Sequence, residues 1–180
     1  DWDGIFDGAD WFHFTGITPA LADSVAEITK EACIAAKKAG VTISCDLNFR
    51  KKLWSKEKAS QVMTDLMQYV DVLFTNEEEA QTLFGIHASQ TDITSGKLNK
   101  DGYEDVARQL VKKFNLKYVS ISLRESISAS VNDWSGMIYD GKKSYFSRVY
   151  HIDHIVDRIG GGDAFSSGMI YGLLNGWSMQ

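Results

Sequence analysis

Apolar residues in the first part of the chain alternate between short continuous runs and segments with helical spacing. Residues 11–16 and 41–45 are short runs rich in aromatic or β-branched residues, which is typical of buried strands. Between them, Pro19 with Thr18 as its cap predicts a helix that ends at Gly40. Its buried stripe is predicted from residues three or four apart: Leu21, Val25, Ile28, Ala32, Ala35 and Ala39. Such a strand–helix–strand unit implies parallel pairing with a right-handed crossover.

The same alternation continues as far as residue 123. The predicted elements are a helix over residues 55–69, a strand over 70–75, a helix over 77–84, a polar loop around 90–101, a helix over 103–114 and a strand over 118–123. The first of these helices has a clear apolar stripe: Ala59, Val62, Met63, Leu66 and Met67. Repeated alternation of this kind indicates a layered α/β sheet.

After residue 123 the pattern changes to short alternating segments over residues 128–132, 136–139 and 144–149. The stretches Asp133-Trp134-Ser135 and Asp140-Gly141-Lys142 separate them, and the second carries an Asp-Gly turn signal. We therefore expect antiparallel hairpins at the later end of a mostly parallel sheet flanked by helices.

Composition narrows the class of protein. The 180 residues are 44% hydrophobic and 24% charged, with a formal net charge of −5, which argues against a nucleic-acid partner. No apolar segment approaches the roughly 20 residues needed to span a bilayer, so no membrane partner is expected. The two cysteines, Cys33 and Cys45, have no CxxC partner and are expected to be buried reduced thiols in a cytoplasmic protein.

Three consecutive glycines, Gly160 to Gly162, stand between an apolar run and a segment with helical spacing. Glycine permits positive φ and a close approach of a ligand to the backbone. The unpaired N–H groups of a first helical turn favour negative charge. The glycine run therefore predicts a phosphate cradle at the start of a helix.

Asp163 follows the glycines directly, where its carboxylate would repel a bound phosphate. Its position is explained if the carboxylate accepts a proton from a hydroxyl that attacks phosphorus, while the amides stabilise the transferring group. The alternative is purely structural, because aspartate is a favoured helix N-cap and a glycine run can be a tight turn.

The stretch D-R-I-G-G-G-D-A-F, residues 157–165, resembles the D-x-x-G-x-G-D-x-F signature of the ribokinase-like (pfkB) sugar kinases, and most of all the branch that phosphorylates 2-keto-3-deoxygluconate. Arg158 stands where threonine is usual in that family, and Gly161 where alanine is usual. The resemblance implies a ribokinase-like layered sheet, ATP and Mg²⁺ as cofactors, and Asp163 as the catalytic base beside the amides of Gly160, Gly161 and Gly162. It also implies that Asp157 and Arg158 lie near the nucleotide.

The resemblance covers nearly all of the chain but only the central and later part of such a kinase. The sequence opens on Asp1 without an initiator Met. We therefore expect one partial α/β kinase domain over residues 1–180, lacking the family's lid and part of its nucleotide site, and inactive on its own.

Polar residues directly after the predicted strands are further site candidates, because ligands bind beyond the carboxyl ends of parallel strands. Asp46, Asn48 and Arg50 follow one strand with a period of two, which places them on one side of an extended segment. Arginine has a planar fork suited to carboxylate or phosphate. D-x-N-x-R is similar to the motif of the sugar-acid branch, which implies substrate binding by these residues. The alternative is a structural Asp46–Arg50 pair.

Asn76 and Glu79 follow the next strand with the spacing of a capping box, which needs no metal. N-x-x-E also resembles the family motif that organises magnesium, and oxygen ligands suit that cation. Ser122 and Arg124 follow a third strand, where family members carry a lysine and a glycine near the nucleotide phosphates. Arg124 supplies the cation there or is a solvated side chain.

Together, the residues and the resemblance predict ATP-dependent phosphorylation of 2-keto-3-deoxygluconate on its 6-hydroxyl, with the sugar acid and ATP as partners and a homo-oligomer possible when full length. The alternatives are another sugar kinase of the family, such as a fructokinase, or a non-catalytic module that binds a sugar phosphate or nucleotide.

Overall fold

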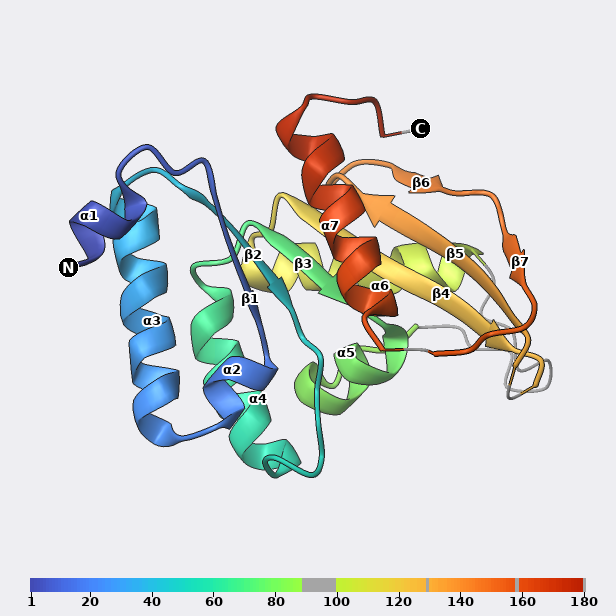
Figure 1. Ribbon diagram of the computed structural model, residues 1–180, viewed down its shortest axis with the longest axis horizontal. Helices are drawn as coiled ribbons and strands as arrows, with labels where there is room; N and C mark the ends of the chain where they lie inside the picture. The colour runs from blue at the N-terminus through green and yellow to red at the C-terminus, as the bar shows by residue number, and fades with distance from the viewer. Residues whose placement is uncertain (89–99, 129, 158, 180) are drawn as a thin grey trace.

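The computed structural model describes residues 1–88, 100–128, 130–157 and 159–179, and within them the chain forms one seven-stranded sheet in the order β1-β2-β3-β4-β5-β6, with β7 also paired to β5 (Figure 1). The strands are β1 (Trp11–Thr15), β2 (Thr42–Asp46), β3 (Val72–Thr75), β4 (Tyr118–Ser126), β5 (Asn132–Tyr139), β6 (Ser144–Phe146) and β7 (Tyr150–Ile152). The first four are parallel, and β5 pairs antiparallel with β4, β6 and β7. The predicted layered α/β sheet, mostly parallel with antiparallel strands at the later end, is confirmed.

The helices are α1 (Trp2–Phe6), α2 (Ile17–Ala20), α3 (Asp23–Lys38), α4 (Lys56–Met67), α5 (Glu77–Phe84), α6 (Lys100–Phe114) and α7 (Gly161–Leu174). Helices α3 to α6 follow one another along one face of the sheet, whereas α7 crosses the other face over β4 and β5 (Figure 1). Among the described residues, no helix is long and apolar enough to cross a bilayer.

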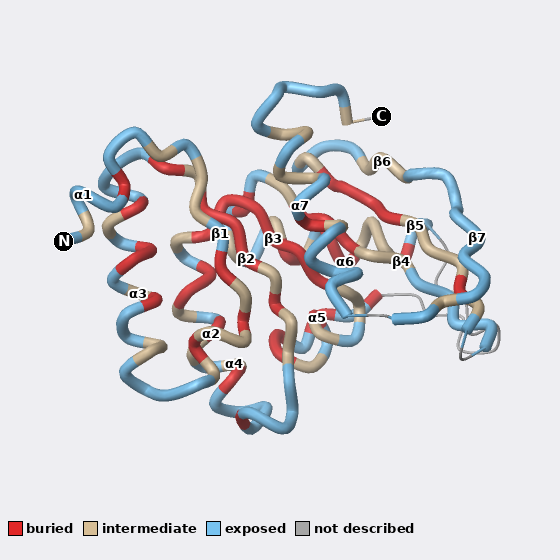
Figure 2. The backbone as a smooth tube through the Cα atoms, viewed as in Figure 1, coloured by how far each residue is buried: buried red, intermediate tan, exposed pale blue. Residues whose placement is uncertain are grey.

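The main core lies between the sheet and helices α3 to α6, and the strands form its buried centre (Figure 2). The strand residues that face these helices are at most 1% exposed: Ile43, Cys45, Leu73, Val119, Ile121 and Met137. Both cysteines are buried and free, as the sequence predicted.

The predicted helix beginning at Pro19 is two helices. Gly16, rather than Thr18, caps the short helix α2 that contains Pro19, and Ala22 is extended (φ −165°) before α3 begins. The chain turns at Gly16 because its amide donates to the Asp46 carbonyl at 2.8 Å, and a Cβ there would lie 2.0 Å from the Leu47 carbonyl oxygen.

The buried face of α3 also differs from the predicted stripe. Leu21 is 63% exposed and Ile28 is 51% exposed, and Ala39 is exposed as well. The buried residues of the helix are Thr29, Ala32, Cys33 and Ala36. Small residues let a helix pack closely on a sheet, so the face of α3 with small side chains is buried. The large aliphatic residues Leu21 and Ile28, used to predict the buried stripe, are exposed instead.

A further correction concerns Asp133-Trp134-Ser135, which was predicted as a turn and lies inside β5. Trp134 pairs with Arg124 of β4, because both strands continue past the part of the sheet that packs on the helices. The predicted Asp140-Gly141 turn is confirmed: Gly141 has φ +86°, and the Asp140 carboxylate accepts from the Lys142 and Lys143 amides at 2.8 and 2.7 Å.

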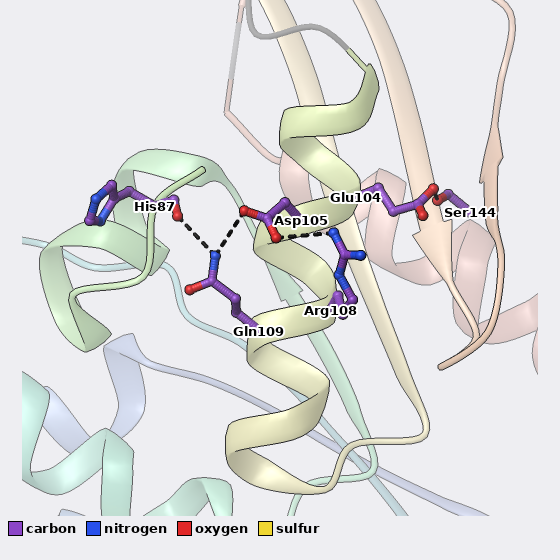
Figure 3. A network of polar contacts seen from close by, with 6 residues as sticks. All are labelled: His87, Glu104, Asp105, Arg108, Gln109 and Ser144. Atoms are coloured by element: carbon purple, nitrogen blue, oxygen red, sulfur yellow. Dashed lines mark hydrogen bonds and ion pairs between the residues drawn. The ribbon is translucent and has the colours of Figure 1, made fainter. Parts of the chain in front are cut away.

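Helix α6 begins three residues earlier than predicted, and most of the loop predicted before it lies outside the described residues. Polar contacts fix this helix on both sides (Figure 3). Gln109 donates to the His87 carbonyl at 3.0 Å and to Asp105 at 3.1 Å, which joins α6 to the end of α5. Glu104 accepts from the Ser144 hydroxyl, which joins α6 to β6.

Asp71 connects several elements at the other end of the sheet, where the parallel strands begin. It is 6% exposed, and its carboxylate accepts from the Ile43 amide at 3.0 Å and from Lys37 at 2.7 Å. Lys117 lies 3.2 Å from the other oxygen. Burial raises the pKa of Asp71, but these donors outweigh it and hold the pKa below its ordinary value.

Candidate active site at the carboxyl edge of the sheet

A cleft of about 700 Å³ opens at the carboxyl ends of β2, β3 and β4, beside the first turn of α7. This is where a sheet of parallel strands places its ligands. The sequence-predicted residues that line it are Asp46, Asn48, Arg50, Asn76, Glu79, Ser122, Arg124, Asp157, Gly161 and Gly162. Gly160 and Asp163 flank this lining. Arg158 lies outside the described residues.

The start of α7 has the geometry that three glycines allow. Gly160 is the N-cap with φ +78°, a left-handed conformation that favours glycine. Its carbonyl accepts from the Ala164 amide at 2.8 Å, and the Asp157 carboxylate closes the preceding turn by accepting from the Ile159 amide at 2.8 Å. Asp163 is therefore the third residue of the helix, and the alternative that it is the N-cap is wrong.

The amides of Gly162 and Asp163 point out of the helix start, and among the described residues no carbonyl or side chain accepts from them. A Cβ on Gly162 would lie 3.8 Å from the Asp46 carboxylate, and one on Gly161 would lie 3.8 Å from the Trp134 ring. The helix start is thus a positively polarised concavity between a carboxylate and an aromatic ring, which suits an anion.

Asp163 is exposed rather than buried, and its charge acts on two neighbours, His13 and Asp46. Partial desolvation of the imidazole lowers the pKa of His13, and the Asp163 carboxylate opposes this shift. His13 Nδ1 lies 2.7 Å from the Ser44 hydroxyl, which also accepts from Trp11 Nε1 at 2.8 Å. Sequence reasoning missed His13 because it treated residues 11–16 as a uniformly buried strand. The alternation of Trp11, His13 and Thr15 was the available signal, because residues two apart in a strand lie on the same face of the sheet.

Asp46 and Glu79 form a desolvated carboxylate pair at the base of the cleft. Burial raises the pKa of Asp46 to about 6, with the charge of Asp163 adding to the shift and the Asn48 amide and Arg50 opposing it. Burial also raises the pKa of Glu79 to about 7, with the charge of Asp46 adding to it. Two desolvated carboxyl groups whose charges repel each other create a site that a cation would stabilise.

The sequence left open whether Asn76 and Glu79 form a capping box or a magnesium site. One half of the box is present, since Asn76 Oδ1 accepts from the Glu79 amide at 2.9 Å. The Glu79 carboxylate instead accepts from the Phe49 amide at 3.0 Å, so it reaches across to the segment after β2. The described residues contain no group of three or more metal-ligating side chains. Asp46, Asn76 and Glu79 all line the cleft, and one or two carboxylates with water and phosphate oxygens form the ligand set that Mg²⁺ prefers.

The segment after β2 places its polar residues as predicted, on the cleft side. Asn48 has φ +38° and donates to the Thr15 hydroxyl at 3.1 Å. Arg50 is exposed, donates to the carbonyl of Phe49 at 3.3 Å, and lowers the pKa of Asp46. No ion pair joins Arg50 to Asp46 in the described part of the chain, so the structural-pair alternative does not hold.

The other end of the cleft, at β4 and β5, contains residues that sequence reasoning missed. Trp134 and Asn132 line it together with the predicted Ser122 and Arg124. Apolar side chains complete this wall: Ile152, Ile155, Ile159 and Phe165. Phe165 packs on Gly136, where a Cβ would lie 2.5 Å from its ring. This end of the cleft thus combines an apolar wall with the cation of Arg124.

Comparison with known proteins agrees with this geometry. The chain is 47% identical to a crystal structure of 2-dehydro-3-deoxygluconokinase from Thermotoga maritima, with a TM-score of 0.92, over 100% of this chain and 52% of that one. It is 30% identical to 2-dehydro-3-deoxygluconokinase of Bacillus subtilis over 97% of this chain and 47% of the relative. It is 29% identical to 2-dehydro-3-deoxygalactonokinase of Haloferax volcanii over 96% of this chain and 47% of the relative. The chain spans about half the length of these relatives.

A family match that covers almost the entire chain accounts for the glycine turn and for the carboxylates beside it. Residues 3–180 match the model of the pfkB family carbohydrate kinases, and the chain belongs to that family.

Proposed function

We propose that the protein is an ATP-dependent kinase that transfers the γ-phosphoryl group of ATP to the 6-hydroxyl of 2-keto-3-deoxygluconate. The observation that carries the proposal is the turn into α7. There, the amides of Gly162 and Asp163, which have no acceptor in the described chain, lie beside the exposed carboxylate of Asp163. Family membership supports the reaction type, and the activities named for similar proteins support the substrate class.

In this mechanism Asp163 accepts the proton of the attacking hydroxyl. The amides of Gly162 and Asp163, aligned with the dipole of α7, stabilise the charge on the transferring group. Arg50, exposed at the cleft and without an ion-pair partner in the described chain, binds the carboxylate of the sugar acid. Asp46 and Glu79 would hold Mg²⁺, which when bound offsets the negative charge of the nucleotide phosphates.

The test is the substitution Asp163→Asn in the protein as its gene encodes it. Loss of the base is expected to lower kcat by roughly 10² to 10⁴, while the dissociation constants of the sugar acid and of ADP change little. Turnover is followed as ADP release with 2-keto-3-deoxygluconate, its galactonate counterpart and fructose.

Asp153→Asn is the matched control, because Asp153 is an exposed acid shortly before the glycine turn that does not line the cleft. It should leave turnover unchanged. Near-normal turnover by the Asp163→Asn variant refutes the base assignment. Binding of both ligands by the unaltered protein without ADP release refutes the kinase itself and leaves a binding module.

A further inference from the structure

Arg124 reaches the cleft because β4 and β5 continue together beyond the parallel part of the sheet. The pairing of β4 with β3 ends at Ile121, opposite Thr75. The pairing with β5 continues through Arg124, opposite Trp134, to Ser126, opposite Asn132. Arg124 therefore stands three residues, or about 10 Å, past the last parallel pair.

Asn132 fixes the guanidinium of Arg124 from one side. It is 2% exposed, and with its amide oriented to satisfy both ends its oxygen accepts from Arg124 Nε at 3.2 Å. Its nitrogen donates to the Val131 carbonyl at 2.9 Å and to the Ser126 hydroxyl at 3.2 Å. That hydroxyl also accepts from Arg124 Nη2 at 3.1 Å. A buried amide and a hydroxyl thus occupy the Nε–Nη2 edge of the guanidinium.

The rest of the guanidinium is available to a ligand. Of its five N–H donors, two are used by these contacts, and the remaining donors lie on Nη1 and Nη2. In the described part of the chain no carboxylate lies within ion-pair distance of Arg124. A lysine could not replace the arginine here, since it has no second edge for Asn132 to hold.

The surroundings of Arg124 favour a nucleotide over the sugar acid as the source of the anion. Trp134 and three isoleucines line the same end of the cleft, which suits a planar base. Gly161, the first residue of α7, lies next to the Trp134 ring, within the same cleft. The other cation among the described residues that line the cleft, Arg50, lies after β2, separated from Arg124 by the strand β3.

We propose that Asn132 is a positioning residue that aims the outer N–H groups of Arg124 at the phosphates of a nucleoside triphosphate. This rests on the proposed kinase function. It predicts that Asn132 affects nucleotide binding only through Arg124, a dependence that a merely structural role would not produce.

The test is a double-mutant cycle in the protein as its gene encodes it, with Asn132→Leu, Arg124→Ala and both. Affinities for ADP and for a non-hydrolysable ATP analogue are measured by calorimetry, without turnover. Arg124→Ala is expected to weaken binding about 10- to 100-fold, as for a charge-assisted hydrogen bond. Asn132→Leu is expected to weaken binding about 3- to 10-fold, and the double variant to match Arg124→Ala within about twofold.

Ser120→Ala is the matched control. Ser120 is a fully buried polar residue of β4 whose hydroxyl donates to the Met137 carbonyl of β5, without contact to Arg124. Its variant should lose stability but keep nucleotide affinity. Denaturation curves verify that each variant is folded, and Asn132→Ser replaces the leucine variant in the cycle if that variant does not fold.

The outcomes separate the two proposals. Independent, multiplying effects of the two substitutions, or no effect of Asn132→Leu, overturn the positioning role. Weaker binding of the sugar acid instead of the nucleotide in Arg124→Ala overturns the choice of anion. An unaltered protein that binds neither nucleotide refutes the kinase proposal, and this one with it.

Discussion

Glu79 gives the sharpest test of the electrostatics of the cleft. Its pKa in the folded chain is about 7 against an ordinary value of 4.5, chiefly because the carboxyl group is buried. The folded state therefore keeps a proton that the unfolded chain loses near pH 4.5. At about 1.4 kcal/mol per pH unit, this difference corresponds to about 3 kcal/mol.

The sign follows from the raised pKa. The contribution of Glu79 to stability is fully present below about pH 4.5 and is lost as the pH rises through about 7. Glu79→Gln removes this titration, and the amide oxygen can still accept from the Phe49 amide. We expect the variant to match the unaltered chain near pH 4.5 and to exceed its free energy of unfolding by about 3 kcal/mol at pH 8.

The assay is urea denaturation of the 180-residue chain at half-unit steps from pH 4.5 to 8. Glu78→Gln is the control, because Glu78 is the adjacent exposed acid of α5, and its curve should follow the unaltered chain. Parallel pH profiles for Glu79→Gln and the unaltered chain would show that Glu79 titrates normally, and the reasoning would fail. If Asp46 and Glu79 hold Mg²⁺, the ion at ten times its Kd should restore about 1.4 kcal/mol at pH 8 in the unaltered chain and in the Glu78→Gln control, but not in Glu79→Gln.

Three further predictions concern the frame of the site. Gly136→Ala forces a Cβ to within 2.5 Å of the Phe165 ring and should cost about 1–3 kcal/mol in denaturation, whereas an unchanged stability would mean that α7 moves freely. Asp163→Asn should lower the pKa of His13 in an NMR titration of the 180-residue chain, and an unchanged pKa would show that the Asp163 charge does not act on His13. Asp71→Ala should cost about 2 kcal/mol at pH 7. Because the pKa of Asp71 is held below its ordinary value of 3.8, the part of that cost due to the ionised carboxylate should be fully present above pH 3.8 and lost as the pH falls through the lowered pKa.

Local sequence signals predicted the elements whose boundaries are set by local chemistry. Helix α5 begins and ends where predicted, because Asn76 caps it and Gly85 ends it with φ +67°. The parallel strands follow apolar runs, because both faces of the central strands are covered. The glycine turn was predicted from residue type alone, since a left-handed N-cap at Gly160 suits glycine and few other residues.

Features that depend on distant contacts could not be predicted in the same way. Trp134 looked like part of a turn, because Asp133 and Ser135 flank it and only the pairing with β4 shows that the strand continues through them. The orientation of α3 depends on which side chains are small enough to pack on the sheet, which periodicity alone does not rank. His13 and Asn132 acquire their importance from Ser44 and Arg124, residues that only the fold brings to them.

Strand β7 has a consequence for how this enzyme family can vary. Its three residues pair with Asn132, Asp133 and Trp134, and three residues later the Ile155 amide donates to the Ser130 carbonyl at 3.0 Å. A slip of one residue in this pairing would shift that amide by about 3.3 Å, more than a hydrogen bond tolerates, and reverse the side-chain faces of β7. Deletions and insertions should therefore be tolerated between β6 and β7 but not between β7 and Ile155, so natural length variation is expected to be absent from residues 150–155.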